Sequence, residues 1–340
     1  MLHLSQRGLL TKRMTKMLSK SVLALGDVNP DIILPLASDK QSAELLRAGV
    51  SGGGTVANVA SGLGRLSIPV SFCGRTGNDA FGHYMASILE KDGVELSHLA
   101  YDDACFTNMV FGVIEPDGER TIFVWPPEGA AQSRLSRDDL AFDKSTYSHL
   151  HISTINLREE PSADAILWCV ESVKDSSITT TFDLNLRMEF FKDNTHFRDN
   201  LERAIKSSDI ILGSAYDEII PLTGINDPER AARSLAEDTT VIARLGKDGV
   251  LCVDKHKTTF IPAYEVEVMD TIGAGDAFDS GFIAALYEGA TPHMAINWGN
   301  ACAAISITRQ DARSCPTRAE LFAFLRTYHK GESLKEIFFA

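Results

Sequence analysis

The sequence predicts an α/β fold in which helices flank a mainly parallel central sheet. Short apolar runs alternate with segments of helical periodicity over most of the 340 residues, and this alternation implies parallel strands joined by helical crossovers. A chain of this length can bury a large core, and α/β folds of this size often form one unit. Residues 107–125 alternate with period two around a Pro-Asp-Gly turn, which predicts a β-hairpin.

The elements of this fold follow one another along the chain. Residues 22–26 form a short apolar run that is typical of a buried strand. Glycines at 52–54 then precede a helix that extends to residue 66, because Ala57, Ala60 and Leu63 recur at helical spacing. Further strands are predicted at 68–73, 150–153, 179–184, 210–212, 241–244 and 250–253. Further helices are predicted at 81–92, 163–174, 197–207 and 293–308.

Composition and charge argue against two classes of protein. Hydrophobic residues make up 44% and charged residues 23% of the chain, as in ordinary globular proteins. No apolar run approaches the roughly 18 residues that span a bilayer, which argues against a membrane-embedded protein. The formal net charge of −13 argues against a nucleic-acid-binding surface. The six cysteines are scattered without a CxxC pair and predict reduced thiols in a cytoplasmic protein.

The two ends of the chain are expected to differ from its middle. Residues 1–20 carry five basic residues and no acidic one, so the rest of the chain has a net charge of −18. An organelle presequence and a helix on an anionic membrane are two interpretations of this leader. We expect a disordered leader instead, because no secretory apolar region follows it. The folded domain is predicted at 21–330, followed by a C-terminal tail at 331–340.

Residues 264–283 combine three local signals. Alternating valines predict a strand at 264–269, Gly273 and Gly275 predict a turn, and apolar residues at helical spacing follow. Because the N–H groups at a helix N-terminus lack intrahelical partners and the helix dipole adds positive charge, such a turn can hold an anion. Asp276 would cap the helix or take a proton from an attacking hydroxyl group, and the residues alone leave both interpretations open.

Two motifs of the chain resemble the signatures of the ribokinase-like (PfkB) carbohydrate kinases. They are DTIGAGDAF at 270–278 and SGGGTVANVASGLGRL at 51–66, and the resemblance covers roughly residues 22–328. It implies a three-layer α/β/α fold with a mainly parallel sheet and a small β-sheet lid from segments near 32–50 and 105–127. It also implies a cytoplasmic homodimer that pairs through the lid. ATP and Mg²⁺ are the implied cofactors, and the need for a monovalent cation is left open.

The resemblance assigns the chemistry to the turn and the helix after it. Asp276 is implied to be the base, and the N–H groups of Gly273, Ala274 and Gly275 to stabilise the transferring phosphoryl group. The expected reaction transfers the γ-phosphoryl group of ATP to a hydroxyl group of a monosaccharide or sugar acid. A kinase for a nucleoside or another small alcohol is one alternative. A non-catalytic sugar-sensing or partner-binding protein on the same scaffold is the other.

The sugar is expected near the carboxyl end of the first strand, where open α/β sheets bind ligands. The resemblance implies that Asn29 and Asp31 contact the sugar, together with Gly53, Gly54 and Asn58. Asn and Asp would also suit a plain turn at this position, and three successive glycines would suit a flexible connection. The residues alone do not separate these possibilities.

Residues 183–187, DLNLR, predict a polar row at the end of another strand. Alternation along a strand would direct Asp183, Asn185 and Arg187 to one side. The pattern, with the aromatic residues that follow it, resembles fructokinases and 2-keto-3-deoxygluconate kinases. Arg187 would clamp the carboxylate of a sugar acid or a phosphate, or form a structural salt bridge with Asp183.

The remaining landmarks concern the nucleotide and its metal ion. The resemblance implies that Gly246, Gly249 and Asn300 contact the nucleotide and that Glu218 binds Mg²⁺ through water. The GKDG sequence at 246–249 would equally suit a tight hairpin. The sequence departs from the family pattern at two positions, Ala215 and Asp311. The first replaces an asparagine of the metal-water network, and the second replaces a glycine of the monovalent-cation loop.

Overall fold

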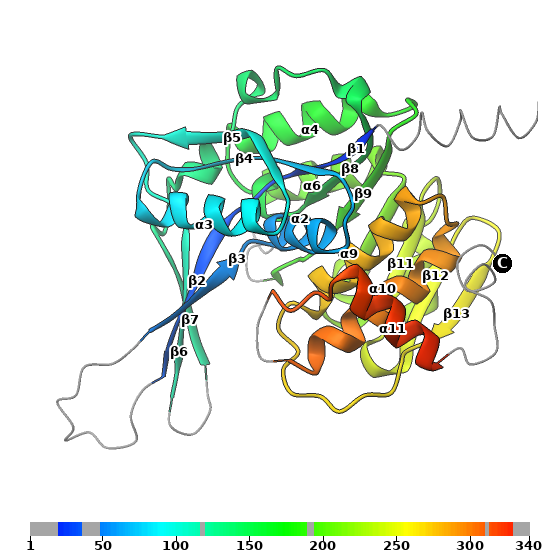
Figure 1. The fold of residues 1–340 in the computed structure, drawn as a ribbon. Coiled ribbons are helices and arrows are strands. Elements are labelled where there is room, and N and C mark those ends of the chain that lie inside the picture. Colours follow the sequence, from blue (N-terminus) through cyan, green and yellow to red (C-terminus); the bar gives the residue numbers. More distant parts are fainter. Residues whose placement is uncertain (1–19, 36–47, 116–119, 189–193, 310–312, 329–340) are drawn as a thin grey trace, which may run out of the picture.

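The computed structural model describes residues 20–35, 48–115, 120–188, 194–309 and 313–328. The predictions for the leader up to residue 19 and for the tail at 331–340 lie outside these ranges. Figure 1 shows one large sheet with helices on both faces and a smaller sheet that extends from one end of it. Among the described residues, no helix has both the length and the apolar character that crossing a bilayer requires.

The large sheet has nine strands in the order β13-β12-β11-β10-β9-β8-β1-β4-β5. All strands from β11 to β5 run parallel, which confirms the predicted mainly parallel sheet, whereas β12 and β13 are antiparallel additions at one edge. The bounds are β1 Ser21–Leu25, β4 Val70–Gly77, β5 Glu95–Asp102, β8 Tyr147–Ser153, β9 Thr179–Asp183, β10 Ile210–Ser214, β11 Thr240–Arg244, β12 Gly249–Val253 and β13 Thr258–Pro262.

Helices cover both faces of the large sheet because its strands are apolar on both sides. In β1, Val22 and Ala24 belong to one core cluster, whereas Leu23 and Leu25 belong to the other. The first cluster includes α2 Thr55–Arg65, α3 Ala80–Lys91, α9 Ala274–Tyr287, α10 Pro292–Ile307 and α11 Arg318–Tyr328. The second includes α4 Ser162–Val173, α6 Thr195–Ser207 and α8 Pro228–Leu235, with the short α7 Ile220–Thr223 beside it.

The small sheet has the strand order β3-β2-β6-β7. Its strands are β2 Asn29–Pro35, β3 Gly49–Gly53, β6 Met109–Ile114 and β7 Arg120–Trp125. The antiparallel pairing of β6 with β7 confirms the predicted hairpin. Asn29 lies opposite Gly53 in the antiparallel pairing of β2 with β3, and Asp31 lies opposite Ser51. The small sheet, called the lid below, therefore brings the two segments of predicted sugar-binding residues together at its base (Figure 1).

The prediction of a strand at 264–269 is wrong. These residues belong to neither sheet, and β13 ends before them. The segment runs along the last helices instead: the ring of Tyr264 packs against Phe324 with centroids 5.2 Å apart, and the N–H of Met269 donates to Ile307 O (2.7 Å). A period-two apolar pattern predicts an extended segment that buries one side. It does not show whether a neighbouring strand or a helix covers that side.

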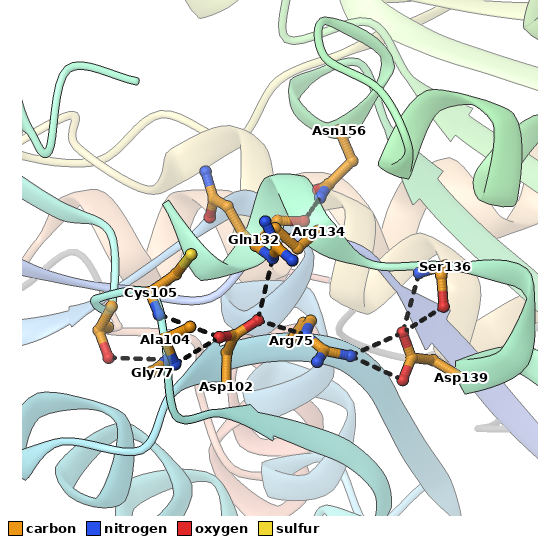
Figure 2. Close-up of polar contacts among 11 residues, drawn as sticks. Arg75, Gly77, Asp102, Ala104, Cys105, Gln132, Arg134, Ser136, Asp139 and Asn156 are labelled. Carbon is orange, nitrogen blue, oxygen red and sulfur yellow. Dashed lines mark hydrogen bonds and ion pairs between the residues drawn. The ribbon is translucent and has the colours of Figure 1, made fainter. Parts of the chain in front are cut away.

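A polar network ties the large sheet to the segment that follows the lid (Figure 2). Arg75 on β4 donates to Asp102 (3.0 Å) and to both oxygens of Asp139 (3.0 and 3.1 Å). Burial opposes ionisation of Asp102, but the N–H groups of Ala104 and Cys105 together with Arg75 hold its pKa below the usual value. The network holds the segment around Asp139 against β4 and β5.

Candidate active site

The helix α9 begins with a tight glycine turn. Gly273 is its N-cap residue and has φ 75°, a left-handed conformation that glycine adopts without strain. Asp276 lies in the first turn of the helix, so the interpretation of Asp276 as the capping residue is wrong. The N–H of Ala274 already donates to Thr271 O (3.2 Å). The predicted anion site therefore depends mainly on the N–H groups of Gly273 and Gly275.

The carboxylate of Asp276 faces the amide of Asn58 on α2. The Asn58 Nδ2 donates to Asp276 Oδ2 at 2.7 Å. Loss of hydration raises the pKa of Asp276 to about 7; the Asn58 hydrogen bond opposes this rise, and the charge of Asp183 adds to it. The structure thus brings together two predicted site residues from opposite ends of the chain, and one of them is a carboxylate that titrates near neutrality.

Asp31 and its neighbours form a second polar group at the base of the lid. Asn29 Nδ2 donates to Asp31 Oδ1 at 2.9 Å. Burial raises the pKa of Asp31 to about 6, although the positive charge of Arg313 and the Asn29 bond oppose the rise. A Cβ at position 53 would overlap the Asp31 carboxylate, so a larger residue there would displace that carboxylate from its present position.

The glycines before α2 are structured. Gly53 ends β3, and Gly54 caps α2 with φ 88°. The first N–H groups of that helix donate to the buried carboxylate of Asp27, from Thr55 at 2.8 Å and from Val56 at 3.2 Å. The flexible-connection interpretation is therefore wrong, because each glycine occupies a defined backbone position.

Arg313 is a residue of the candidate site that the sequence did not indicate. Its Nε donates to Asn58 Oδ1 at 2.8 Å, and its Nη2 donates to Gly53 O at 3.2 Å. Arg313 follows α10 in the chain and lies close to Gly53 at the end of β3 and to Asn58 at the start of α2. No local pattern in the sequence indicates this contact, because Arg313 and Asn58 are 255 positions apart.

Arg244, at the end of β11, lies among three carboxylates. It donates to Asp183 Oδ1 (2.8 Å) and to Asp279 Oδ1 (2.7 Å), and it lies 3.9 Å from Glu218 Oε2. The Arg244 side chain is 16% exposed, and that of Asp279 is fully buried. Burial alone would lower the pKa of Arg244, but the carboxylates raise it. Sequence reasoning missed this cluster too, because its members come from different elements.

Only the first residue of the predicted DLNLR row lies on a strand. Asn185 has φ 30°, which ends the alternation, and its amide donates to Thr55 Oγ1. Asp183 pairs with Arg244, so the predicted salt bridge between Asp183 and Arg187 is wrong. The Arg187 side chain is exposed, and its role as a clamp for an anionic group stays a prediction.

Glu218 has a buried carboxylate held by backbone donors. The N–H of Leu186 donates to Oε1 (3.0 Å) and the N–H of Ser214 to Oε2 (2.6 Å). Burial raises the pKa of Glu218 to about 7. These bonds suit an indirect role through water better than direct coordination, and the Mg²⁺ role stays a prediction. The neighbouring Ala215 is fully buried, so the missing asparagine is replaced by a core contact.

The residues predicted to contact the nucleotide lie in a tight hairpin and on α10. The GKDG sequence forms the tight hairpin between β11 and β12, in which Gly246 has φ 62° and Gly249 has φ 131°. The buried Asn300 donates to Pro262 O at 3.0 Å. The hairpin and the Asn300 hydrogen bond are contacts within the protein, so the nucleotide contacts of Gly246, Gly249 and Asn300 stay predictions. Asp311 and the monovalent-cation prediction attached to it lie outside the described residues.

Comparison with known proteins identifies the family. The chain matches the pfkB family carbohydrate kinase model over residues 19–319. It is 31% identical over 282 residues to a fructokinase of Vibrio alginolyticus, covering 80% of this chain and 91% of that protein.

Two solved structures resemble this one over nearly its whole length. A fructokinase from Vibrio cholerae O395, in a fructose-, ADP- and calcium-bound form, has a TM-score of 0.77 and 29% identity, covering 90% of this chain and 99% of that chain. An aminoimidazole riboside kinase from Salmonella enterica, complexed with aminoimidazole riboside and an ATP analog, has a TM-score of 0.76 and 27% identity over the same shares. They confirm the predicted ribokinase-like α/β fold. The chain therefore belongs to the pfkB family of carbohydrate kinases, and it is a phosphotransferase with an alcohol group as acceptor.

Proposed function

We propose that this enzyme transfers the γ-phosphoryl group of ATP to a hydroxyl group of a monosaccharide or sugar acid, with Asp276 as the base. The pairing of Asp276 with Asn58 at the N-terminus of α9 carries the proposal. It places a carboxylate that can accept a proton beside N–H groups that can stabilise an anion. A pKa of about 7 suits this role, because such a base is largely available at neutral pH and still binds a proton well.

In the proposed reaction, Asp276 takes the proton of the acceptor hydroxyl as its oxygen attacks the γ-phosphorus. The bond from the γ-phosphorus to the bridging oxygen breaks, and ADP leaves. The N–H groups of Gly273 and Gly275 stabilise the charge on the transferring group. MgATP enters as a substrate, with its metal ion neutralising phosphate charge. Water held by Glu218 would contact that ion, and the nucleotide would lie over the predicted residues Gly246, Gly249 and Asn300.

Several buried polar groups support a polyhydroxylated acceptor. Asp31 lies at the base of the lid with Gly53 against its carboxylate. Within the described part of the chain, Thr154 Oγ1 and Asn156 Oδ1 are buried without a hydrogen-bond partner, as is the Gln132 side-chain oxygen. Thr154 and Asn156 follow β8 and lie beyond its carboxyl end. The Asn156 Nδ2 donates to the backbone oxygen of Gln132 at 3.2 Å (Figure 2). A buried polar atom that lacks a partner within the protein is typically satisfied by a water molecule or a ligand.

A ketohexose such as fructose is the first candidate acceptor, because the fructokinases are similar in sequence and in structure. A riboside is the second candidate, supported by the likeness to the aminoimidazole riboside kinase. A sugar acid is the third, supported by the exposed Arg187 that follows β9.

A coupled ADP-release assay with MgATP tests the function against a panel of ketoses, aldoses, keto-deoxy sugar acids and ribosides. One acceptor should stimulate ADP release far above the others. Stimulation by a sugar acid, abolished by Arg187→Gln but little changed by Arg203→Gln, would select the third candidate. ATP binding without any stimulated turnover across the panel would contradict the proposed reaction.

Activity should fall as the pH drops through about 7. Asp276 must be ionised to accept the hydroxyl proton, and its pKa is raised to about 7. We therefore expect kcat/KM for the acceptor to decrease about tenfold for each pH unit on the acidic side of that value. A pH profile with saturating MgATP measures this limb. An acidic limb near pH 4, the ordinary range of an aspartate, would contradict the environment described for Asp276.

We also propose that the enzyme is cytoplasmic and that it forms a homodimer that pairs through the lid. The outer strand β7 exposes Ile122 (65%), Phe123 (47%) and Val124 (41%). Neighbouring apolar side chains on an unpaired sheet edge are typical of an interaction surface.

Ile122→Asp is expected to weaken such a dimer by more than ~10-fold, because an unpaired carboxylate would enter an apolar contact. Light scattering during size-exclusion chromatography over a concentration series measures the change. Phe260→Asp on β13, where Phe260 is 51% exposed outside the lid, is the matched control and should leave the mass unchanged. A monomeric wild-type enzyme at all concentrations would contradict the proposal.

A further inference from the structure

The loop after α10 places a guanidinium group between two predicted sugar-binding elements. Arg313 contacts Asn58 at the start of α2 and the carbonyl of Gly53 at the end of β3. A Cβ at Gly52 would overlap the guanidinium group, so the absence of a side chain there leaves the space that Arg313 fills. The side chain is thus held by two hydrogen bonds and by close packing against the glycine strand.

The amide of Asn58 is bonded at both ends. Its oxygen accepts from Arg313 Nε (2.8 Å), and its nitrogen donates to Asp276 Oδ2 (2.7 Å). An asparagine amide can rotate by half a turn and exchange its donor and acceptor ends with little steric cost. A guanidinium group has only donors, whereas an ionised carboxylate has only acceptors. Arg313 therefore permits one orientation of the Asn58 amide, the one that directs the donor end toward Asp276.

We propose that Arg313 is a positioning residue for the phosphoryl transfer: by fixing the amide of Asn58, it holds the Asp276 carboxylate in place for the acceptor hydroxyl. The proposal rests on the function proposed above, in which Asp276 is the base. A base displaced by about 1 Å can lose on the order of 10²-fold in rate. The arginine acts at a distance from the reacting atoms, through one amide.

Other charged groups also act on Asp276 and Arg313, and a test must separate their effects. Those that act on Asp276 are Asp27 after β1, Asp183 on β9, Arg244 on β11 and Asp279 one turn along α9. Arg313 also attracts the Asp31 carboxylate. Loss of Arg313 would therefore change the charge at the sugar side as well as the orientation of Asn58.

A double-mutant cycle separates these two effects. Arg313→Met should lower kcat by about 10²-fold in the wild-type background. In the Asn58→Ala background the same substitution should change kcat less than about twofold, because the amide through which it acts is already absent. A change in the KM of the acceptor through Asp31 would persist in both backgrounds. An equal loss of kcat in both backgrounds would overturn the proposal.

Arg309→Met is the matched control in the same loop. Arg309 donates to Ser314 O (3.3 Å) and to Glu320 (2.7 Å), so it anchors the loop without touching Asn58. We expect its kcat to stay within about twofold of wild type. Melting temperatures of all variants are measured alongside. If Arg309→Met lowers kcat as much as Arg313→Met at the same melting temperature, the effect belongs to the loop, and the positioning role is overturned.

A carbon-13 NMR titration of the Asp276 carboxyl group provides a readout that does not need turnover. Asp276→Asn assigns the signal. Because the Asn58 hydrogen bond lowers the pKa of Asp276, Arg313→Met should raise that pKa, and Arg313→Lys should raise it less. An unchanged pKa in Arg313→Met overturns the proposal. Full turnover in Asp276→Asn would instead contradict the assigned base, while this titration would still report whether Arg313 orients Asn58.

Discussion

Replacing Asp276 with asparagine is expected to lower kcat by about 10²- to 10⁴-fold while acceptor and MgATP binding remain largely intact. Asparagine has the same shape but cannot take a proton from the acceptor hydroxyl. It can still contact Asn58, so the start of α9 should keep its structure. Steady-state ADP release measures kcat, and calorimetric titration with each substrate measures binding. An effect on kcat without an effect on binding is expected for a group that acts in the transition state.

Asp227→Asn is the matched control for this change. Asp227 caps α8 through the N–H of Arg230 (2.8 Å), and asparagine is an equally good capping residue. The same chemical substitution at another helix N-terminus should leave kcat within about a factor of two. Near-normal turnover in Asp276→Asn would exclude Asp276 as the base.

Replacing Arg244 with methionine is expected to lower the free energy of unfolding by about 3–5 kcal/mol, because it leaves Asp183, Asp279 and Glu218 without their counter-charge in a buried cluster. Urea unfolding at pH 8 followed by circular dichroism measures the loss. The deficit should shrink as the pH is lowered. Burial raises the pKa of all three carboxyl groups, that of Glu218 to about 7. Above its pKa each carboxylate carries a charge that Arg244 no longer compensates, and below its pKa protonation removes that charge.

Arg203→Met provides the comparison for an exposed ion pair. Arg203 lies 2.9 Å from Glu171, with side chains 50% and 41% exposed. Such a pair contributes at most about 1 kcal/mol, so this variant should unfold nearly as wild type does. A similar loss for both arginines, or a deficit of Arg244→Met that grows at low pH, would contradict the cluster's role.

Local patterns predicted the elements of this fold well where the signal was strong. The helix predicted at 293–308 is Pro292–Ile307, and the hairpin at 107–125 pairs Met109 with Trp125. The predictions failed where a partner from elsewhere in the chain decided the outcome. The extended run at 264–269 packs against helices, and the alternation in DLNLR ends after Asp183 because Asn185 turns toward Thr55.

The candidate site was predicted in part for the same reason. Asp276 and Asn58 stand in the two motifs at 270–278 and 51–66, and Asp31 follows the first predicted strand. The structure brings Asp276 and Asn58 into contact. The capping interpretation of Asp276 failed because Gly273, with its left-handed backbone, begins the helix three residues earlier. Arg313 stands in no such motif, so its contact with Asn58 was not predicted.

By itself, the sequence determined the local features of this protein: most helices and most strands, the glycine turn before Asp276, and the family to which the two motifs belong. These features depend on side-chain spacing and backbone freedom over a few residues, which the order of amino acids states directly. Only the tertiary structure decided which charges meet. Arg313 reaches Asn58 across 255 positions, and Arg244 joins carboxylates from three other elements. Such pairs form because packing brings residues from distant parts of the chain together. The order of the amino acids does not show which of these residues will meet.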